Sequence, residues 1–316
     1  MAHLAPRGYA GTYGAPHSIA RFYTSYHIAR DHKHFTLKIG TLKALEGELR
    51  VLRHFNTIKT NHPGSLLFRQ LLDEFQVDGK NSIFHCSLHP PLAISVKSFR
   101  KLFPERALPV VVVKLVLKHL LISLDFLHTE AKVIHTGTSD RITEPHLLFI
   151  GALNRDSFLK KKYTDIQESN ILLGMNEETA EQDLEKFEND ELTSPGARKI
   201  DGDRIIYTSR PLVPPVYNYG RPVLCDFGEA RFGEYDNIAD IQPYQYRAPE
   251  VNFDIPWDEK VDIWSVGVMV SPHSSLSDDQ RPIRVCRPGT CLGPEICFAP
   301  QEVQRINRTI SITLRI

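Results

Sequence analysis

Two short segments of the 316-residue chain carry carboxylate and amide side chains at a spacing that suits phosphate chemistry. In the segment 164–173, Asp165 precedes Asn170 by five positions, and Asp226 opens the later segment Asp226-Phe227-Gly228. Magnesium prefers hard oxygen ligands and often shares them with substrate phosphates. We therefore predict that Asn170 and Asp226 bind a magnesium ion. Asp165 is predicted to accept a hydroxyl proton and to orient the attacking oxygen for phosphoryl transfer.

A third segment, Arg247-Ala248-Pro249-Glu250, follows the first two along the chain. An isolated Asp-Phe-Gly is often a simple turn, so one such string has little specificity. Three strings in a fixed order are far more specific than any one of them. Together they indicate one site for phosphate chemistry rather than three unrelated turns.

The elements upstream of these segments can be read from the spacing of apolar residues. The segment 35–39 alternates between apolar and polar residues and predicts a strand that carries Lys38. After Gly40 the period becomes helical, which predicts a helix that carries Glu48. Its apolar face consists of Leu42, Leu45, Leu49, Leu52 and Phe55.

Two more elements are predicted in the middle of the chain. The segment 83–88 has the character of a strand and ends before Pro90-Pro91, because proline cannot donate to a sheet ladder. The segment 109–128 is apolar for most of its length but contains Lys114 and Asp125. It is therefore predicted to be a core helix rather than a membrane span.

Composition excludes several classes of protein. Lysine plus arginine and aspartate plus glutamate each number 38, so no overall field draws the chain to nucleic acid or to an anionic membrane. The five cysteines are odd in number, and three of them (Cys286, Cys291 and Cys297) crowd near the C-terminus without the paired spacing of zinc sites. We expect a cytoplasmic or nuclear protein that contacts neither nucleic acid nor membrane directly.

An acidic run lies between Met175 and Glu191 and contains eight aspartate and glutamate residues. Such a run is most often the solvated face of a helix. The alternative is a docking surface for a basic substrate. Both interpretations remain open from the sequence.

The order of the three segments, D-x-x-x-x-N, D-F-G and A-P-E, resembles the signature set of eukaryotic protein kinases. The flanking segments 220–231 and 241–251 resemble the serine/arginine-rich-protein kinase-like group, in particular fungal kinases in which Thr-Asp replaces the usual Arg-Asp. The resemblance extends from about residue 23 to Met269. It implies an α+β, two-lobed fold with a small β-rich N-lobe and a helical C-lobe that is truncated.

The resemblance also implies roles for residues outside the three segments. Lys38 matches the strand lysine that holds the phosphates of ATP, and Glu48 matches the helix glutamate that orients this lysine. The segment 86–92 matches the hinge between the lobes, where Leu88 would contact the adenine ring. A helix that starts at Asp262 would lie buried under the active site.

The resemblance divides the chain into four parts. Residues 1–22 are expected to form a mobile N-terminal arm, 23–92 an N-lobe, 93–269 a C-lobe, and 270–316 a poorly ordered tail. An atypical insert at 137–164 separates His135-Thr136 from Asp165. We hypothesise that the insert and the tail derive from introns or from splicing or reading-frame errors; a regulatory insertion is the alternative for 137–164.

Three further positions depart from the family pattern. No Gly-x-Gly-x-x-Gly motif precedes Lys38, and Gly8, Gly11 and Gly14 have a different spacing, so they are expected to belong to the arm. Only ten positions separate Lys38 from Glu48. Gln167 stands where most serine/threonine kinases have a lysine.

The predicted activity is that of a protein serine/threonine kinase that uses ATP and Mg²⁺, with basic Arg/Ser-rich proteins among its substrates. The first alternative is a catalytically inactive pseudokinase or a truncated kinase fragment. The second is a small-molecule phosphotransferase of the aminoglycoside kinase type. The string Arg247-Ala248-Pro249-Glu250 and the tyrosine before it count against this second alternative.

Overall fold

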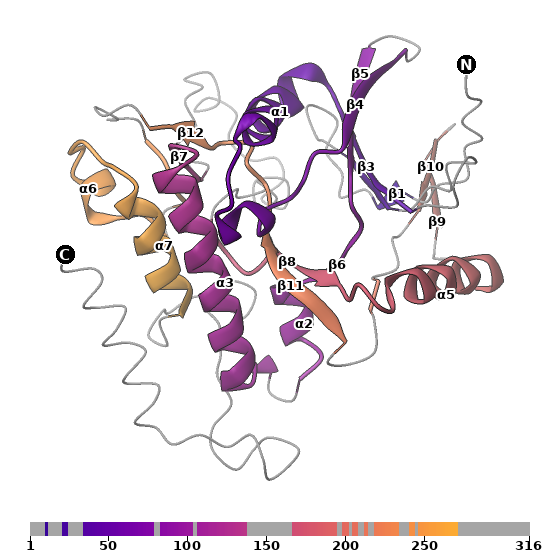
Figure 1. Ribbon diagram of the computed structural model, residues 1–316. Helices are drawn as coiled ribbons and strands as arrows, with labels where there is room; N and C mark the ends of the chain where they lie inside the picture. The colour runs from indigo at the N-terminus through magenta and orange to yellow at the C-terminus, as the bar shows by residue number, and fades with distance from the viewer. Residues whose placement is uncertain are drawn as a thin grey trace, which may run out of the picture. The chain divides into compact units, whose positions relative to one another are not determined.

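The computed structural model describes residues 10–11, 21–24, 34–78, 83–103, 106–137, 166–194, 198–201, 204–207, 212–213, 218–233, 240–243 and 246–270. The chain divides into two units. The first comprises Met1–Asn61, Ser65–Ile94 and Leu172–Gly228, and the second comprises His62–Gly64, Ser95–Ile171 and Glu229–Ile316. The secondary structure is α+β, as predicted (Figure 1).

The first unit is built on a seven-stranded sheet with the order β4-β5-β3-β2-β1-β10-β9. Neighbouring strands are antiparallel, except that β1 pairs with β10 in parallel. In the register of the sheet, Lys38 lies between Phe22 and Ser87. The strands are β1 (Ala10–Gly11), β2 (Arg21–Thr24), β3 (Thr36–Gly40), β4 (Asp73–Asp78), β5 (Ile83–His89), β9 (Arg198–Asp201) and β10 (Arg204–Tyr207).

The main helix of this unit, α1 (Leu42–Thr57), follows β3 after one residue, Thr41. Its buried face carries the leucine and phenylalanine positions that the helical period predicted, with Leu45, Leu49, Leu52 and Phe55 each at most 4% exposed. Leu42 is the exception, because it lies in the exposed first turn. Burial of this stripe, rather than helix propensity, is what holds a helix against a sheet.

A smaller sheet, in the order β11-β8-β6, consists of β6 (Leu92–Ser95), β8 (Ile171–Met175) and β11 (Tyr219–Leu224). The chain between β8 and β11 forms α5 (Ala180–Thr193) and then the strands β9 and β10. Asn218, just before β11, hydrogen-bonds to Asn176 and Thr179 at 2.6 and 2.7 Å, which fixes the start of α5. This segment is therefore an integrated part of the first unit.

The second unit is mainly helical. It contains α2 (Val96–Arg100), α3 (Val110–Thr129), α6 (Pro249–Asn252) and α7 (Lys260–Val270), with the strand pair β7 (Val133–Ile134) and β12 (Arg231–Phe232). Figure 1 shows α7 beside α3. The short 3-10 helix η1 (Pro63–Leu66) spans the boundary between the two units. The second unit has a core cluster that consists of Ile134, Ile241, Ala248, Val251, Trp257 and Val261.

The structure confirms most of the predicted elements and changes some boundaries. The strands and helices predicted at 35–39, 42–55, 83–88 and 109–128 are present as β3, α1, β5 and α3. Residues 10–11 and 21–22 of the predicted arm are strands of the sheet. The first unit extends to Ile94 rather than to residue 92, and it includes 172–228, which the sequence had assigned to the C-lobe.

Most of the predicted insert and the whole tail after Val270 lie outside the described residues. None of the helices among the described residues is long and apolar enough to cross a membrane.

Candidate active site

The first pair of predicted site residues, Lys38 and Glu48, is in direct contact. The Lys38 ammonium on β3 donates a hydrogen bond to Glu48 Oε2 on α1. Both side chains are buried, at 3% and 5% exposure. The ten-residue spacing is sufficient because a single residue joins β3 to α1 and Glu48 lies two turns into the helix. A paired, buried ammonium at this place presents a fixed positive charge for binding a phosphate.

The segment that carries Asp226 packs on the same helix. Phe227 is fully buried, and its ring meets Phe55 of α1 edge-on, with the centroids 5.2 Å apart. Phe227 also lies edge-on to Phe68, with the centroids 6.3 Å apart. Aromatic pairs favour this edge-to-face arrangement. The Asp-Phe-Gly segment is therefore seated on the helix that positions Glu48.

Gly47 allows a still closer approach of the two segments. A Cβ atom on Gly47 would lie 2.5 Å from the carbonyl oxygen of Gly228, closer than real Cβ contacts. Glycine in a helix interior costs stability, so its place next to Glu48 has a structural reason. Only a residue without a side chain lets α1 touch the backbone of Asp226-Phe227-Gly228.

Asp226 itself has an unusual backbone. Its φ angle is 68°, in the left-handed region that aspartate adopts more readily than most residues but still at a cost. The carboxylate follows the end of β11 and is 8% exposed. Such strained positions are concentrated at functional sites. The oxygen chemistry of Asp226 fits a magnesium ligand.

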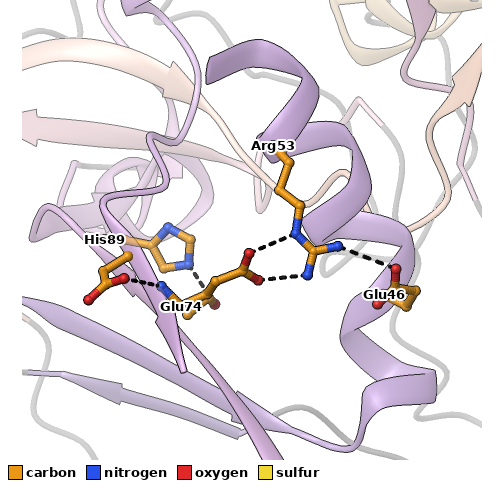
Figure 2. Close-up of polar contacts among 6 residues, drawn as sticks. Glu46, Arg53, Glu74 and His89 are labelled. Atoms are coloured by element: carbon orange, nitrogen blue, oxygen red, sulfur yellow. Dashed lines mark hydrogen bonds and ion pairs between the residues drawn. The ribbon is translucent and has the colours of Figure 1, made fainter. Parts of the chain in front are cut away.

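One charged pair, Arg53 with Glu74, ties α1 to the strand β4. Arg53 of α1 donates two hydrogen bonds to Glu74 of β4, both 2.7 Å long, and a longer one of 3.4 Å to Glu46 within α1. Figure 2 shows the three side chains. The hydrogen bonds from Arg53 lower the pKa of Glu74 and raise that of the arginine. The pair is partly exposed, so its contribution to stability is small, but its geometry fixes α1 on β4.

Leu88, the predicted adenine contact, lies within β5. It pairs with Leu37 of β3 and Asp73 of β4, and its carbonyl accepts a hydrogen bond from Leu72 N–H at 2.8 Å. Next to it, His89 is fully buried between the Gln70 carbonyl and the Ser87 hydroxyl, at 2.8 and 2.9 Å. Burial, helped by the charge of nearby Arg69, lowers the pKa of His89 to about 3. His89 is therefore a neutral member of the sheet at ordinary pH.

In the second unit, Asp262 fixes the backbone at His135 and Thr136. Asp262 is fully buried on α7, and its two carboxylate oxygens accept the backbone N–H groups of His135 and Thr136 at 2.8 and 3.0 Å. Oδ2 also lies 2.9 Å from His128 Nε2. The Thr136 hydroxyl donates to the Glu229 carbonyl at 2.6 Å. A helix, α7, is thus present at Asp262 as the resemblance implied, and it holds the backbone of His135 and Thr136.

The loop before β8 contains Asn170, which is 5% exposed. Its N–H donates to the Gln167 carbonyl at 2.9 Å, which closes a tight turn. Asn170 belongs to the second unit and Asp226 to the first. Asp165, the predicted catalytic base, lies outside the described residues.

Sequence reasoning missed a buried polar node at Gln242, which is fully buried. Its side-chain amide donates to the Val261 carbonyl and the Ser265 hydroxyl, at 2.8 and 2.9 Å, and accepts the Ala248 N–H at 2.9 Å. Its backbone N–H donates to the Gly137 carbonyl at 3.1 Å. The φ angle of 62° for a residue other than glycine was not visible in the sequence. The node joins the Ala-Pro-Glu segment to α7.

Sequence reasoning also missed a buried ion pair beside Asn170. Arg100 of α2 donates from Nε to Glu168 Oε2 at 2.9 Å, and the two side chains are 4% and 6% exposed. Burial raises the pKa of Glu168, while the charge of Arg100 opposes this shift. The spacing of positions 100 and 168 in the sequence could not have predicted this contact.

Comparison with known proteins identifies the kind of chain to which this site belongs. A serine/threonine protein kinase of Aspergillus fumigatus is 33% identical over 242 residues, which cover 76% of this chain and 50% of the relative. The serine/threonine-protein kinase SRPK of Physarum polycephalum is 30% identical over 234 residues, 72% of this chain and 50% of the relative. The chain is a homologue of serine/threonine protein kinases. Its α+β architecture is that of a partial kinase fold.

Other relatives of this kinase homologue match shorter segments. SRSF protein kinase 3 of Mus musculus is 28% identical over 114 residues, 36% of this chain and 19% of the relative. No family model matches the chain. The kinase homologue spans about half the length of these relatives from Aspergillus fumigatus and Physarum polycephalum. The predicted resemblance to serine/arginine-rich-protein kinases is thereby confirmed.

Proposed function

We propose that the chain transfers the γ-phosphoryl group of ATP to serine or threonine hydroxyls of protein substrates. The observation that carries this proposal is the buried Lys38–Glu48 ion pair, formed on the helix that also seats Phe227. Burying two charges is costly. A catalytically inactive fragment would bear this cost without any benefit from an ammonium group placed beside an Asp-Phe-Gly segment. The alternative of an inactive pseudokinase receives no comparable support.

Each site residue has a role in this proposal. Lys38, oriented by Glu48, binds phosphate oxygens of ATP, and the β5 segment at Leu88 borders the adenine. Asn170 and Asp226 supply the amide and carboxylate oxygens that suit Mg²⁺. When bound, this ion neutralises phosphate charge. Asp165 accepts the proton of the substrate hydroxyl.

The reaction is an in-line displacement. The hydroxyl oxygen forms a bond to the γ-phosphorus, the bond to the β–γ bridging oxygen breaks, and ADP leaves with the electron pair. The hydroxyl proton passes to the Asp165 carboxylate. Little covalent chemistry falls to the protein, so the contribution of the side chains is positioning and charge.

We propose basic proteins, including Arg/Ser-rich segments, as the substrates. Two observations support this choice. Relatives include the serine/threonine-protein kinase SRPK and SRSF protein kinase 3. The acidic run also forms a helix, α5, on which Glu181 and Glu185 are exposed. The acidic surface and a basic peptide are complementary in charge.

Purified chain with ATP, Mg²⁺ and a panel of basic serine peptides tests the proposal. We expect phosphate to be transferred to serine. In Asp165→Ala we expect the rate of this transfer to fall at least 100-fold, with nucleotide binding retained. Neutral peptides of the same length are the control for substrate class. A nucleotide-dependent rise in melting temperature without any transfer would instead identify a binding-only chain.

A further inference from the structure

The buried Arg100–Glu168 pair is one part of a larger connection between α2 and the loop that carries Asn170. Besides the side-chain bond at 2.9 Å, the Lys97 N–H of α2 donates to the Glu168 backbone carbonyl at 3.1 Å. Arg100 also donates from Nη1 to the Arg106 carbonyl at 3.2 Å. Glu168 is therefore held through both its side chain and its backbone by one short helix.

The connection bears on Asn170 because Glu168 lies in the same turn. Glu168 lies between Gln167 and Asn170, in the turn closed by the hydrogen bond from Asn170 N–H to the Gln167 carbonyl. The loop is anchored inside as well, because Ile166 is fully buried. A change at Glu168 must therefore move a turn whose far end is Asn170.

We propose that Arg100 and Glu168 are positioning residues of the phosphoryl-transfer site, in which the α2 guanidinium fixes the loop so that Asn170 is held in one orientation. This proposal rests on the proposed function for its effect on catalysis. The chemistry of the pair supports it. A guanidinium is a rigid planar donor, and here it donates to two acceptors, Glu168 and the Arg106 carbonyl. It therefore fixes the orientation of the Glu168 side chain as well as balancing its charge.

A purely stabilising role does not account for the arrangement equally well. Buried ion pairs often contribute no more stability than apolar side chains of the same volume. Their advantage is geometric, since a hydrogen-bonded pair permits one arrangement of the two elements. Catalytic groups depend on such placement, and a displacement of about 1 Å can cost about 100-fold in rate.

Two substitutions at Glu168 separate position from charge. Glu168→Gln and Glu168→Ala both remove the carboxylate charge opposite Arg100, but only glutamine keeps an oxygen that accepts the arginine Nε–H. We expect kcat to fall about 30-fold in Glu168→Ala and no more than about 3-fold in Glu168→Gln, with KM for ATP within about 2-fold in both. Val116→Ala, a buried position on α3, is the control for general loss of stability.

Amide hydrogen exchange reports on the loop without relying on activity. The Asn170 N–H donates the bond that closes the turn, and the Lys97 N–H donates the bond that joins α2 to the Glu168 carbonyl. We expect their exchange to accelerate at least 10-fold in Glu168→Ala but to change little in Glu168→Gln. Val116→Ala is expected to leave both kcat and these two amides close to the wild-type values.

The kinetic measurements and the exchange measurements test separate parts of the proposal. Equal losses in the alanine and glutamine variants, or an equal loss of kcat in Val116→Ala, would overturn the positioning role. If the wild-type chain transfers no phosphate, the proposed function fails, and the exchange data alone decide the structural part. A difference in exchange between alanine and glutamine then supports the connection from Arg100 to the loop, and its absence overturns it.

Discussion

Gly47 offers a sharp test of how closely α1 and the Asp-Phe-Gly segment depend on each other. The substitution Gly47→Ala adds one methyl group, whose carbon would lie 2.5 Å from the carbonyl oxygen of Gly228. Ordinary contacts of a Cβ atom begin near 3.4 Å. The two backbones must therefore separate by roughly 0.9 Å, or α1 must rotate away from Gly228.

The free energy of unfolding responds to two opposing terms. Alanine in a helix interior is favoured over glycine by about 1 kcal/mol. Overpacking against a backbone atom costs about 1–3 kcal/mol. The expected net effect is a destabilisation of about 0–2 kcal/mol. The effect on transfer should be larger, because a shift of about 1 Å in the segment that carries Asp226 can cost about 100-fold in kcat.

Gly267 provides a matched control for this substitution. It also lies inside a helix, α7. Apart from its chain neighbours and the backbone of its own helix, no atom of the described residues lies within 4 Å of the place that its Cβ would take. Gly267→Ala should therefore raise the free energy of unfolding by about 0.5–1 kcal/mol and leave kcat unchanged. Urea unfolding and peptide phosphorylation measure both quantities. If Gly47→Ala behaves like Gly267→Ala in both assays, the close contact between α1 and Gly228 is wrong.

Three further predictions follow from buried or paired charges. Asp262→Ala removes the acceptors of the His135 and Thr136 N–H groups, so we expect a loss of about 3 kcal/mol or more in the free energy of unfolding and fast exchange of both amides; a loss below about 1 kcal/mol would contradict the anchoring role. Because the pKa of His89 is lowered to about 3 while an unfolded histidine titrates near 6.5, the unfolded chain binds the extra proton first, and this site should lower the free energy of unfolding by about 1.4 kcal/mol per pH unit as pH falls between about 6 and 4. His89→Gln should remove that part of the pH dependence, and identical slopes in wild type and variant would refute it. Arg53→Ala should cost less than about 1 kcal/mol, because the Arg53–Glu74 pair is partly exposed; a loss above about 2 kcal/mol, measured by urea unfolding, would show that the pair matters more than its exposure indicates.

The periodic parts of the fold were predictable from the sequence. Alternation in 35–39 and the leucine stripe after Gly40 specify β3 and α1, because burial on one face requires those periods. The contact of Lys38 with Glu48 follows from these two elements once they pack together. The two-residue strand β1 could not be predicted, because a strand of that length contains no period and is defined by its partners β2 and β10.

The contacts that hold the site together were harder to predict than its motifs. Asp262 and His135 are separated by 127 positions, and the bond is to a backbone N–H, which has no sequence signature. Arg100 and Glu168 are 68 positions apart, and charged residues are usually exposed. Gln242 adopts a left-handed backbone that its residue type does not favour. In each case, tertiary structure selects a partner that local sequence does not identify.

The metal site is the most direct test of the central claim that this kinase homologue performs phosphoryl transfer with Asn170 and Asp226 as metal ligands. Crystals grown with Mn²⁺ and a non-hydrolysable ATP analogue allow the ion to be located by its anomalous scattering. We predict a nucleotide-dependent peak bonded to side-chain oxygens of both residues. A peak bonded to neither residue, or no peak that depends on the nucleotide, would contradict the claim.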